Sequence, residues 1–576
     1  MDEIVFDIET DGINPTVIHC WSASGGKHGT TKESFQREVL DTGATLVGHN
    51  ILAYDCPALR RLWGLDFTGV NLVDSLVLSR LANPSRPGGH GLEAWGNTLG
   101  YPKVAHEDWT TYSPEMKHRC DVDVEINERV LKLVRKELSG FKDESLALEH
   151  SIAEIIASQV SNGCELDTMA ALMLAAELRD EQARVEQECQ ETFRPLATPG
   201  PQVTPKLTKQ GTLSKVGTKF LGDDWGSLGG PCTRVTFPPF NLGSNAQIAA
   251  HLGRLGWKPK TLTPTGAPVV DEGALKDVDI PEAQLILRYK NLSKVATMIE
   301  SWLEAQDDDG RIRGYVNPNG AVTGRMTHSS PNLAQVPARG DLGSKCRELF
   351  IAKEGYSLVG MDASGLELRM LAHYMGDEAY TKAVVEGNSK DGTDAHSVNM
   401  RAAGLGDRAT AKTFIYALLY GAGDGKIAEI AGLPRAKDGK ALKERFLRAT
   451  PALGSLKSRV EAAAARGYLI GLDGRRIAVR SQHAALNTLL QGAGAVVMKR
   501  SNCLLRDSLG AEGVWQQGVY QVLSVHDEIQ AEVRDDLVPM YREHAEAAMV
   551  AAGEYYNLRC PLSGDSASGA NWNETH

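Results

Sequence analysis

One stretch of the sequence lines up four side chains that can bind a polyanion and a flat ring. They recur at every fourth position, as Arg408, Lys412, Tyr416 and Tyr420. In a helix with about 3.6 residues per turn, this spacing places them on one slowly drifting face. A nucleoside triphosphate has matching parts, because Arg and Lys bind phosphate and aromatic rings stack on a base. An amphipathic helix with a solvated basic face would have the same pattern, so this stretch alone leaves both interpretations open.

The remaining residues of the stretch can hold such a helix in place. Its other face carries apolar side chains that can pack against a core, namely Phe414, Ile415, Leu418 and Leu419. Gly421 follows, and glycine most readily adopts the left-handed conformation that ends a helix. We therefore predict a helix that begins at Arg408 and ends at Gly421.

Two further segments each place a carboxylate beside a buried strand. Leu358–Arg369, L-V-G-M-D-A-S-G-L-E-L-R, predicts a strand, then Asp362, then a helix. Val522–Gln530, V-L-S-V-H-D-E-I-Q, predicts two strands joined by a turn that contains Asp527. Neither segment identifies a site by itself, since the H-D-E of the second is only three letters long.

The N-terminal region contains a second set of acids. Asp7 and Glu9 lie two residues apart in a predicted strand, Ile4–Thr10, so they share one face of it. Like charges in contact are unfavourable unless a cation lies between them. Asp55 and Asp123, the second of which we predict to open a helix, complete a set of four acids. Such a set can hold two Mg²⁺ ions that activate water against a phosphodiester.

The composition is that of a globular protein with a local basic region. Hydrophobic residues make up 42% and charged residues 23% of the chain, and no apolar run is long enough to span a membrane. The nine cysteines include no C-x-x-C pair, which is typical of reduced cytosolic thiols. The net charge is −11, but residues 401–500 hold 18 Lys and Arg against 7 Asp and Glu, or +11, which leaves −22 elsewhere. The basic region surrounds the helix at Arg408, where a polyanion would dock.

The length of 576 residues predicts several domains, in a multidomain α/β and α+β protein. Helical periodicity dominates residues 144–190. Residues 194–239 carry seven prolines with little periodicity, which indicates a loop or an extended insertion. The sequence G-L-D-G-R-R at 471–476 predicts a tight turn, from which Arg475, Arg476 and the nearby Arg480 could contact a phosphate.

Taken together, the motifs resemble those of family A (Pol I-like) DNA polymerases. The Asp362 segment, the Arg408 helix and the Asp527 segment match motifs A, B and C in the family's order, and T-G-R at 323–325 with P-N-L-A-Q-V-P at 331–337 resembles the entry to the palm. The four N-terminal acids resemble a DEDD-type 3′–5′ exonuclease. Residues 74–81 and 91–96 resemble the replicative polymerases of short-tailed coliphages.

The resemblance implies an order of domains. We expect an RNase H-like exonuclease at 1–138, followed by a right-hand polymerase of palm, fingers and thumb. The thumb would occupy 139–315 with an insertion loop at 194–239, the palm 316–370 and 485–576, and the fingers 371–484.

The resemblance also implies roles for individual residues. In the polymerase site, the expected catalytic residues are Asp362, Asp527 and Glu528. The expected metal ligands are Asp362, Ala363 and Asp527, which would bind two Mg²⁺ ions, or Mn²⁺ in their place, for phosphoryl transfer. The triphosphate, base and sugar would be bound by Glu367, His396, Arg408, Lys412, Tyr416 and Tyr420. DNA would be bound by Arg325, Asn332, Gln335, Asn487, Gln491 and His526.

Three of these roles have a direct physical basis. Arg325 and Gln491 would test the primer-terminal pair from the minor groove, where every Watson–Crick pair offers similar acceptors. Glu367 would leave no room for a ribose 2′-hydroxyl. The Tyr416 hydroxyl would replace the 3′-hydroxyl that a dideoxynucleotide lacks, so we predict that dideoxynucleotides are incorporated readily.

The position of the residue that would activate water in the exonuclease departs from one of the two patterns of the DEDD family. In the DEDD family it is a Tyr four residues before the last Asp or a His five residues before it. The first position is Arg119, which cannot act as a base, and the second is His118, which can. We therefore predict His118 as the base, while Asp121 is a rival carboxylate on another face of the helix.

The resemblance also implies partners. These are primer–template DNA and dNTPs, a helicase–primase, and a thioredoxin-like host processivity factor that would bind residues 194–239, in the cytoplasm of a bacterium infected by a phage. The alternative for residues 194–239 is a flexible loop that contacts DNA phosphates through Lys206, Lys209, Lys215 and Lys219. A single-subunit RNA polymerase is disfavoured by Glu367. A non-catalytic DNA-binding scaffold is disfavoured because every carboxylate that the two sites need is present. A repair-type polymerase with an inactive exonuclease would follow if His118 or the N-terminal metal site fails.

Overall fold

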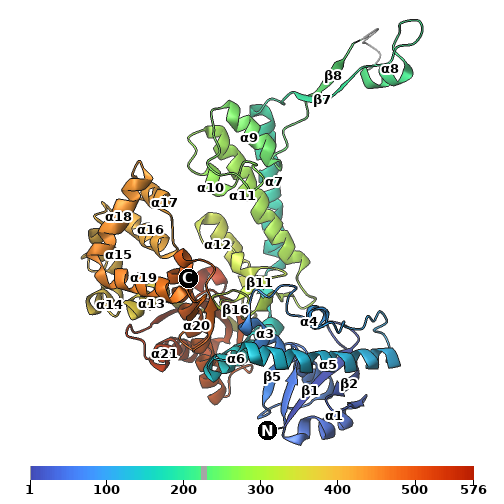
Figure 1. Cartoon of the computed structure of the whole chain (residues 1–576), viewed down its shortest axis with the longest axis vertical. Coiled ribbons are helices and arrows are strands. Elements are labelled where there is room, and N and C mark those ends of the chain that lie inside the picture. The colour runs from blue at the N-terminus through green and yellow to red at the C-terminus, as the bar shows by residue number, and fades with distance from the viewer. Residues whose placement is uncertain (1, 222–229, 576) are drawn as a thin grey trace. The chain divides into compact units, whose positions relative to one another are not determined.

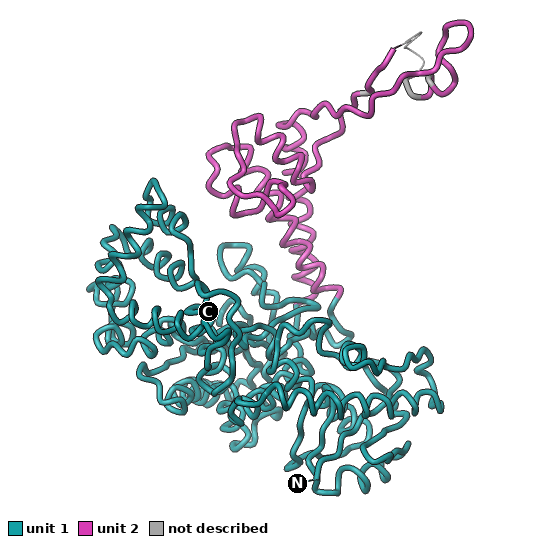
Figure 2. Tube along the Cα trace, in the orientation of Figure 1, with its two compact units in different colours: residues 1–166, 305–576 teal, residues 167–304 magenta. Residues whose placement is uncertain are grey.

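A computed structural model describes residues 2–221 and 230–575 (Figure 1), so residues 222–229 of the predicted insertion lie outside the described residues. The chain divides into two compact units, coloured separately in Figure 2. Unit 1 comprises Met1–Leu166 and Ala305–His576, and unit 2 comprises Asp167–Glu304. None of the described helices is long and apolar enough to cross a membrane.

The N-terminal part of unit 1 is an α/β region built on a five-stranded sheet with the strand order β3-β2-β1-β4-β5. The first three strands are antiparallel, and β4 and β5 run parallel to β1. The strands are β1 (Glu3–Thr10), β2 (Ile18–Ala23), β3 (Lys27–Gly29), β4 (Thr45–Gly48) and β5 (Leu72–Asp74). Because β1 is buried along most of its length, its apolar residues hold Asp7 and Glu9 in a rigid strand.

Helices cover this sheet and form two apolar cores with it. They are α1 (Lys32–Glu38), α2 (Asp55–Trp63), α3 (Ser75–Ala82), α4 (Leu92–Leu99) and α5 (Pro114–Glu137). Helix α5 packs on β1 and β2. It begins much earlier than predicted, because Ser113 caps it and Pro114 occupies its first turn. The prediction that Asp123 opens this helix is therefore wrong, and Asp123 lies in its third turn.

The second sheet of unit 1 is antiparallel in the order β16-β17-β13-β18. Its strands are β13 (Tyr356–Ala363), β16 (Val519–Val525), β17 (Glu528–Arg534) and β18 (Gly564–Gly569). Helix α21 (Val538–Tyr555) packs on β13 and β18 and against α20 (Ala485–Ala511). The predicted strand–acid–helix at Asp362 and strand–acid–strand at Asp527 are thereby confirmed.

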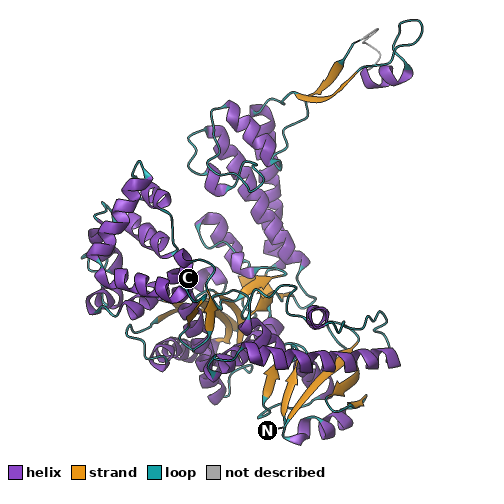
Figure 3. Ribbon diagram, viewed as in Figure 1, coloured by secondary structure: helices purple, strands orange, loops and turns teal. Residues whose placement is uncertain are grey.

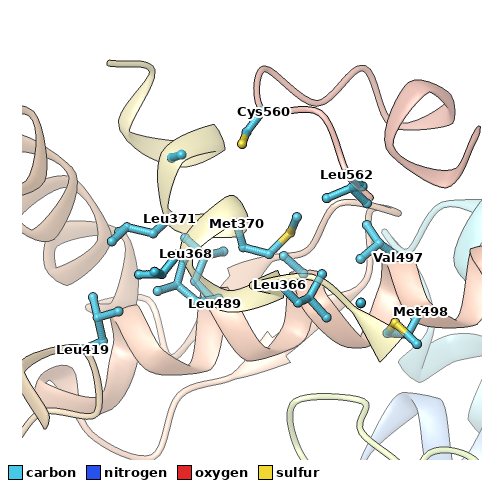
Figure 4. Close-up of a cluster of buried hydrophobic side chains, with 14 of the residues drawn as sticks. Leu366, Leu368, Met370, Leu371, Leu419, Leu489, Val497, Met498, Cys560 and Leu562 are labelled. Carbon is cyan, nitrogen blue, oxygen red and sulfur yellow. The ribbon is translucent and has the colours of Figure 1, made fainter. Parts of the chain in front are cut away.

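A helical region follows β13 in the chain and is visible in Figure 3 as a group of helices. It consists of α13 (Leu366–Met375), α14 (Glu378–Val385), α15 (Ala395–Ala403), α16 (Arg408–Leu419), α17 (Asp424–Ile430), α18 (Ala436–Ala449) and α19 (Pro451–Ala464), with the hairpin β14 (Tyr468–Ile470) and β15 (Arg476–Ala478). One apolar core joins this region to the sheet. Figure 4 shows Leu366, Met370 and Leu371 of α13 beside Leu489 and Val497 of α20.

One long helix connects the regions built on the five-stranded and the four-stranded sheets of unit 1, and shorter elements complete the unit. Helix α6 (Asp143–Asn162) contacts α3 as well as α20 and β16. The other elements are β6 (Cys164–Leu166), β9 (Arg311–Ile312), β10 (Tyr315–Asn317), β11 (Thr327–Ser329), α12 (Gly340–Glu348), β12 (Phe350–Ile351) and the C-terminal 3-10 helix η6 (Trp572–Thr575).

Unit 2 is built on two long helices that pack together, α7 (Thr168–Thr192) and α11 (Pro281–Glu304). Its remaining elements are β7 (Thr198–Val203), α8 (Lys215–Leu221), β8 (Cys232–Thr236), α9 (Asn245–Arg254) and α10 (Glu272–Leu275). The predicted thumb, 139–315, is therefore wider than this unit. The described part of the predicted insertion is not wholly irregular, since β7 and β8 pair as a hairpin.

Candidate active sites

The acids of the second sheet meet at the ends of two neighbouring strands. Asp362 pairs with Glu528 across β13 and β17, and the Ala363 N–H donates to the Asp527 carbonyl over 2.9 Å. His526, in the turn before Asp527, has a φ of 56°. A non-glycine residue in this left-handed region is uncommon, and it makes the turn tight enough to present Asp527 beside Asp362.

A third acid, which no sequence pattern indicated, adjoins this pair. Asp565 of β18 lies opposite Asp362 across the sheet, and Ser364 Oγ donates to its carboxylate. Burial, together with the charges of Asp527, Glu528 and Asp565, raises the pKa of Asp362 to about 7. This concentration of negative charge suits a divalent cation, for which Asp362, Asp527 and the Ala363 carbonyl were predicted as ligands.

Glu528 is held by the C-terminal helix. Its carboxylate accepts hydrogen bonds from Trp572 Nε1 over 2.6 Å and from Gln530 Nε2 over 2.5 Å. Burial raises its pKa, and the Arg347 guanidinium, which stacks on the Trp572 ring, opposes that shift. Glu528 is therefore bound by side chains that pack around the sheet, and its catalytic role stays a prediction.

Helix α16 has the predicted division into an apolar buried face and a face that carries Arg408, Lys412, Tyr416 and Tyr420. Its C-cap is Tyr420, and Gly421 follows with a φ of 77°, so the helix ends where predicted. Phe414 and Ile415 are buried, whereas Arg408 and Lys412 are exposed.

The aromatic end of this face reaches the strand–acid–helix segment. The Tyr420 hydroxyl donates to the two carboxylate oxygens of Glu367, at 2.9 and 2.7 Å, and Arg325 pairs with the same carboxylate at 3.4 Å. Burial raises the pKa of Tyr416, and the charges of Glu367 and Asp527 add to that effect. The two tyrosines and the two segments that carry Asp362 and Asp527 thus belong to one site.

The cationic end of α16 meets another acid that no sequence pattern indicated. Arg408 donates from Nη2 to Asp394 Oδ2 over 2.6 Å, and Asp394 also caps α15. His396, on α15, lies with its ring 6.1 Å from that of Tyr416. A cavity of about 290 Å³ is lined in part by Asp394, His396 and Arg408.

The residues predicted to bind DNA lie on several elements of unit 1. Arg325 and His526 line one small cleft of about 30 Å³ together with Glu528. Asn332 caps the short 3-10 helix Leu333–Gln335, and Asn487 and Gln491 lie on α20. Their contacts with DNA stay predictions.

One expectation about phosphate contacts is wrong. The turn at Gly471–Arg476 was expected to expose Arg475 to template phosphate, but Arg475 is 3% exposed. It pairs at 2.6 Å with Asp473 and with Glu149 of α6, and Glu149 also binds Lys499 of α20. This buried network fastens α6 to the β14–β15 turn and to α20.

The N-terminal acids form a second site. Oxygen atoms of Asp7, Glu9 and Asp123 all lie within 4.8 Å of one another. Glu9 Oε1 and Asp123 Oδ1 are buried and receive no hydrogen bond from any residue in the described ranges 2–221 and 230–575. Buried carboxylate oxygens of this kind fit a divalent cation. Asp55, buried at the start of α2, lies outside this group of three but is electrostatically coupled to it.

The crowding of these acids shifts their proton affinities. Burial raises the pKa of Asp7 well above its ordinary value, and the charges of Asp123 and Asp55 add to the shift. Burial raises the pKa of Glu9 to about 7 and that of Asp55 to about 8. The site therefore needs positive charge if all its acids are to be ionised near neutral pH.

Among the residues that the structure describes, Lys103 and Arg119 form ion pairs with these acids, and His118 forms none. Lys103 Nζ pairs with Asp123 Oδ2, and Arg119 Nε lies 3.2 Å from Glu9 Oε1. Arg119 precedes Asp123 by four residues, so it shares its helix face, whereas His118 points about 140° away and is exposed. Asp121 binds Ser22 and Lys117 instead. The role of His118 as the base stays a prediction. No sequence pattern pointed to Lys103, which lies in a polar loop.

Comparison with known proteins decides the family. Residues 227–574 match the family described as "DNA polymerase family A". The chain belongs to DNA polymerase family A. It is 32% identical to "DNA-directed DNA polymerase" of Enterobacteria phage T3 and of Escherichia phage T7, with all of each chain covered. It is 30% identical to "DNA polymerase I" of Pseudomonas aeruginosa, over 63% of this chain and 42% of that one.

A solved structure agrees with the fold. The "POL domain of Pol1 from M. smegmatis complex with DNA primer-template and dNTP" superposes with a TM-score of 0.77 at 20% identity, covering 99% of this polymerase and 95% of that chain. The predicted multidomain right-hand polymerase fold is thereby confirmed. Membership of a DNA polymerase family also argues against a single-subunit RNA polymerase and against a non-catalytic scaffold.

Proposed function

We propose that this DNA polymerase extends a primer on a DNA template with two Mg²⁺ ions at Asp362 and Asp527, and that residues 1–138 proofread the 3′ end. Its relatives in phages T3 and T7 support a role in replication of a phage genome. The main support for the proposal is that Asp362 and Asp527 lie beside each other, next to the end of α16 that carries Tyr416 and Tyr420.

The side chains around the acids have separable tasks. Mg²⁺ bound at the two aspartates would supply charge that lowers the pKa of the primer 3′-hydroxyl and stabilises the leaving pyrophosphate. Arg408 and Lys412, exposed on α16, would hold the triphosphate of the incoming nucleotide. The Tyr420 hydroxyl donates one bifurcated hydrogen bond to the two oxygens of Glu367, so Glu367 would present a fixed surface to the sugar.

Single-nucleotide incorporation tests the polymerase proposal. We expect wild type to extend a primer in Mg²⁺, and Asp527→Asn to lose at least about 10³-fold in rate. Asp535→Asn is the matched control, because Asp535 follows the far end of β17 and binds Ser357 rather than the site. Equal activity of wild type and Asp527→Asn would refute the proposal.

Degradation of a 3′-labelled, mismatched primer in Mg²⁺ without nucleotides tests proofreading. Wild type should digest it, and Asp7→Ala/Glu9→Ala should not, while Asp11→Asn, which replaces an acid that follows β1 and binds Thr16, should behave as wild type. Loss of digestion in His118→Ala would support His118 as the base. A wild type that extends primers but leaves this substrate intact would instead indicate a repair-type polymerase with an inactive exonuclease. The exposed position of His118 is the observation that supports this alternative.

The processivity factor and the helicase–primase stay predictions. Val235 and Phe237, on and beside β8, are exposed, as are Lys215 and Lys219 of α8, so this segment offers side chains that a partner can bind. Co-purification of the full chain with thioredoxin, compared with a chain whose 198–236 segment is replaced by a short Gly-Ser linker, tests the first of these.

A further inference from the structure

The exonuclease acids are partly neutralised by the protein itself. Of the four carboxylates, Asp123 pairs with Lys103 and Glu9 pairs with Arg119, so two of four negative charges have a cationic partner within the fold. Lys103 and Arg119 are 21% and 16% exposed, which means that both side chains lie largely inside the site.

Arg119 is held at Glu9 by its surroundings. Its Nη1 donates to the Val104 carbonyl, and its guanidinium lies 5.0 Å from the centre of the Trp109 ring. Trp109 is in turn fixed, because His19 binds its carbonyl at 2.9 Å. The segment between α4 and α5 therefore aims both Lys103 and Arg119 at the acids.

The contact between Arg119 and Glu9 is chiefly one of charge. Arg119 Nε and Glu9 Oε1 are 3.2 Å apart, yet neither atom has a well-aligned hydrogen-bond partner among the described residues. A divalent cation carries twice the charge of a guanidinium and prefers carboxylate oxygens. It can therefore replace Arg119 at Glu9 without breaking a well-aligned hydrogen bond between those two atoms.

We propose that Arg119 is a resident counter-ion of the exonuclease centre and that a divalent cation binds at Asp7, Glu9 and Asp123 by exchange with it. Arg119 lowers the affinity of the centre for metal, and so raises the Mg²⁺ concentration at which the 3′ end is excised. This inference rests on the proposed exonuclease function, and it makes Arg119 a positioning residue that sets metal occupancy.

Metal binding can be measured without the reaction. We would use electron paramagnetic resonance of Mn²⁺ with the full chain carrying Asp362→Asn and Asp527→Asn, which removes the two aspartates proposed to bind metal in the polymerase site. In this background the Arg119→Leu variant should bind Mn²⁺ at the exonuclease acids about tenfold more tightly than the parent protein, which keeps Arg119. Arg119→Lys, which keeps the charge, should stay close to the parent.

Arg129→Leu is the matched control. Arg129 lies on the same helix, α5, but pairs with Glu125 and stacks on Tyr101, at 3.7 and 3.8 Å. We expect its affinity for Mn²⁺ to equal that of the parent. Circular dichroism identifies any variant that does not fold, and Arg119→Gln then takes the place of Arg119→Leu.

The outcomes separate this inference from the proposed function. If the parent binds Mn²⁺ in a manner that requires Asp7 and Glu9, but Arg119→Leu binds no more tightly, the exonuclease proposal stands and the counter-ion proposal is wrong. If no binding depends on Asp7 and Glu9 in either protein, both proposals are wrong. A tighter site in Arg119→Leu but not in Arg129→Leu supports the exchange.

Discussion

The hydrogen bond between Trp572 and Glu528 allows a quantitative test of how the C-terminus supports the polymerase site. Trp572→Phe removes the indole N–H that lies 2.6 Å from Glu528 Oε1, while the Phe ring can still stack under Arg347. A hydrogen bond to a charged acceptor contributes about 1.5–3 kcal/mol. Trp572 is 1% exposed, so the smaller ring also leaves a void that costs roughly 1 kcal/mol. We expect unit 1 to lose about 3 kcal/mol of stability in all.

The contribution of the hydrogen bond can be separated from that of the void. In a double-mutant cycle with Glu528→Met, which removes the acceptor oxygen that Gln would keep, followed by urea unfolding and far-UV circular dichroism, the void appears in both Trp572→Phe arms and cancels. The coupling energy should be about 1.5–3 kcal/mol. The rate of nucleotide incorporation should also fall in Trp572→Phe, because Glu528 directly follows Asp527. A coupling energy below about 0.5 kcal/mol would refute the reasoning that Trp572 holds Glu528.

Three further predictions concern the two sites and the network between them. Tyr416→Phe should discriminate against dideoxynucleotides far more strongly than wild type in a chain-termination assay, and unchanged termination would contradict the role given to its hydroxyl. Glu149→Gln should destabilise unit 1 by about 3–5 kcal/mol in urea unfolding, because Arg475 and Lys499 lose the charge of a shared buried partner; a loss below about 1 kcal/mol would count against this. The pKa of Asp362 and that of Glu9 are each raised to about 7, so protonation of these acids favours the folded state. Their contribution to the free energy of unfolding is complete below the unfolded pKa of about 4 and is lost as pH rises through 7. In EDTA, Tm should therefore fall between about pH 5 and pH 7.5, and Mg²⁺ should restore more of it at the higher pH; a metal-induced rise in Tm that is independent of pH would be inconsistent with these shifts.

Local sequence signals predicted the segments that the structure brings together in the candidate polymerase site. The apolar runs beside a carboxylate that form β13, β16 and β17, and the four-residue spacing on α16, are short-range patterns that a single segment encodes. The start of α5 at Ser113–Pro114 also has a local signal, namely a capping serine followed by proline. The prediction instead began the helix at Asp123, and it therefore treated His118 as a loop residue although His118 lies inside the helix.

Residues that depend on long-range packing could not be predicted in this way. Asp565 reaches the site only because β18 pairs with β13, and Lys103 reaches Asp123 only because a loop folds over α5. Arg475 was expected at the surface because it follows a turn, yet its partner Glu149 is distant in sequence. Pairing partners of strands and of buried charges are set by tertiary structure, which no single segment encodes.

The most direct test of the central claim is the rate of single-nucleotide incorporation by wild type, Asp362→Asn, Asp527→Asn and Asp535→Asn on one primer–template in Mg²⁺. The two acids that meet at the strand ends are predicted to be needed, so Asp362→Asn and Asp527→Asn should each lose at least about 10³-fold, with Asp535→Asn unchanged. Incorporation by either site variant at the wild-type rate would contradict the assignment of this centre as the polymerase active site.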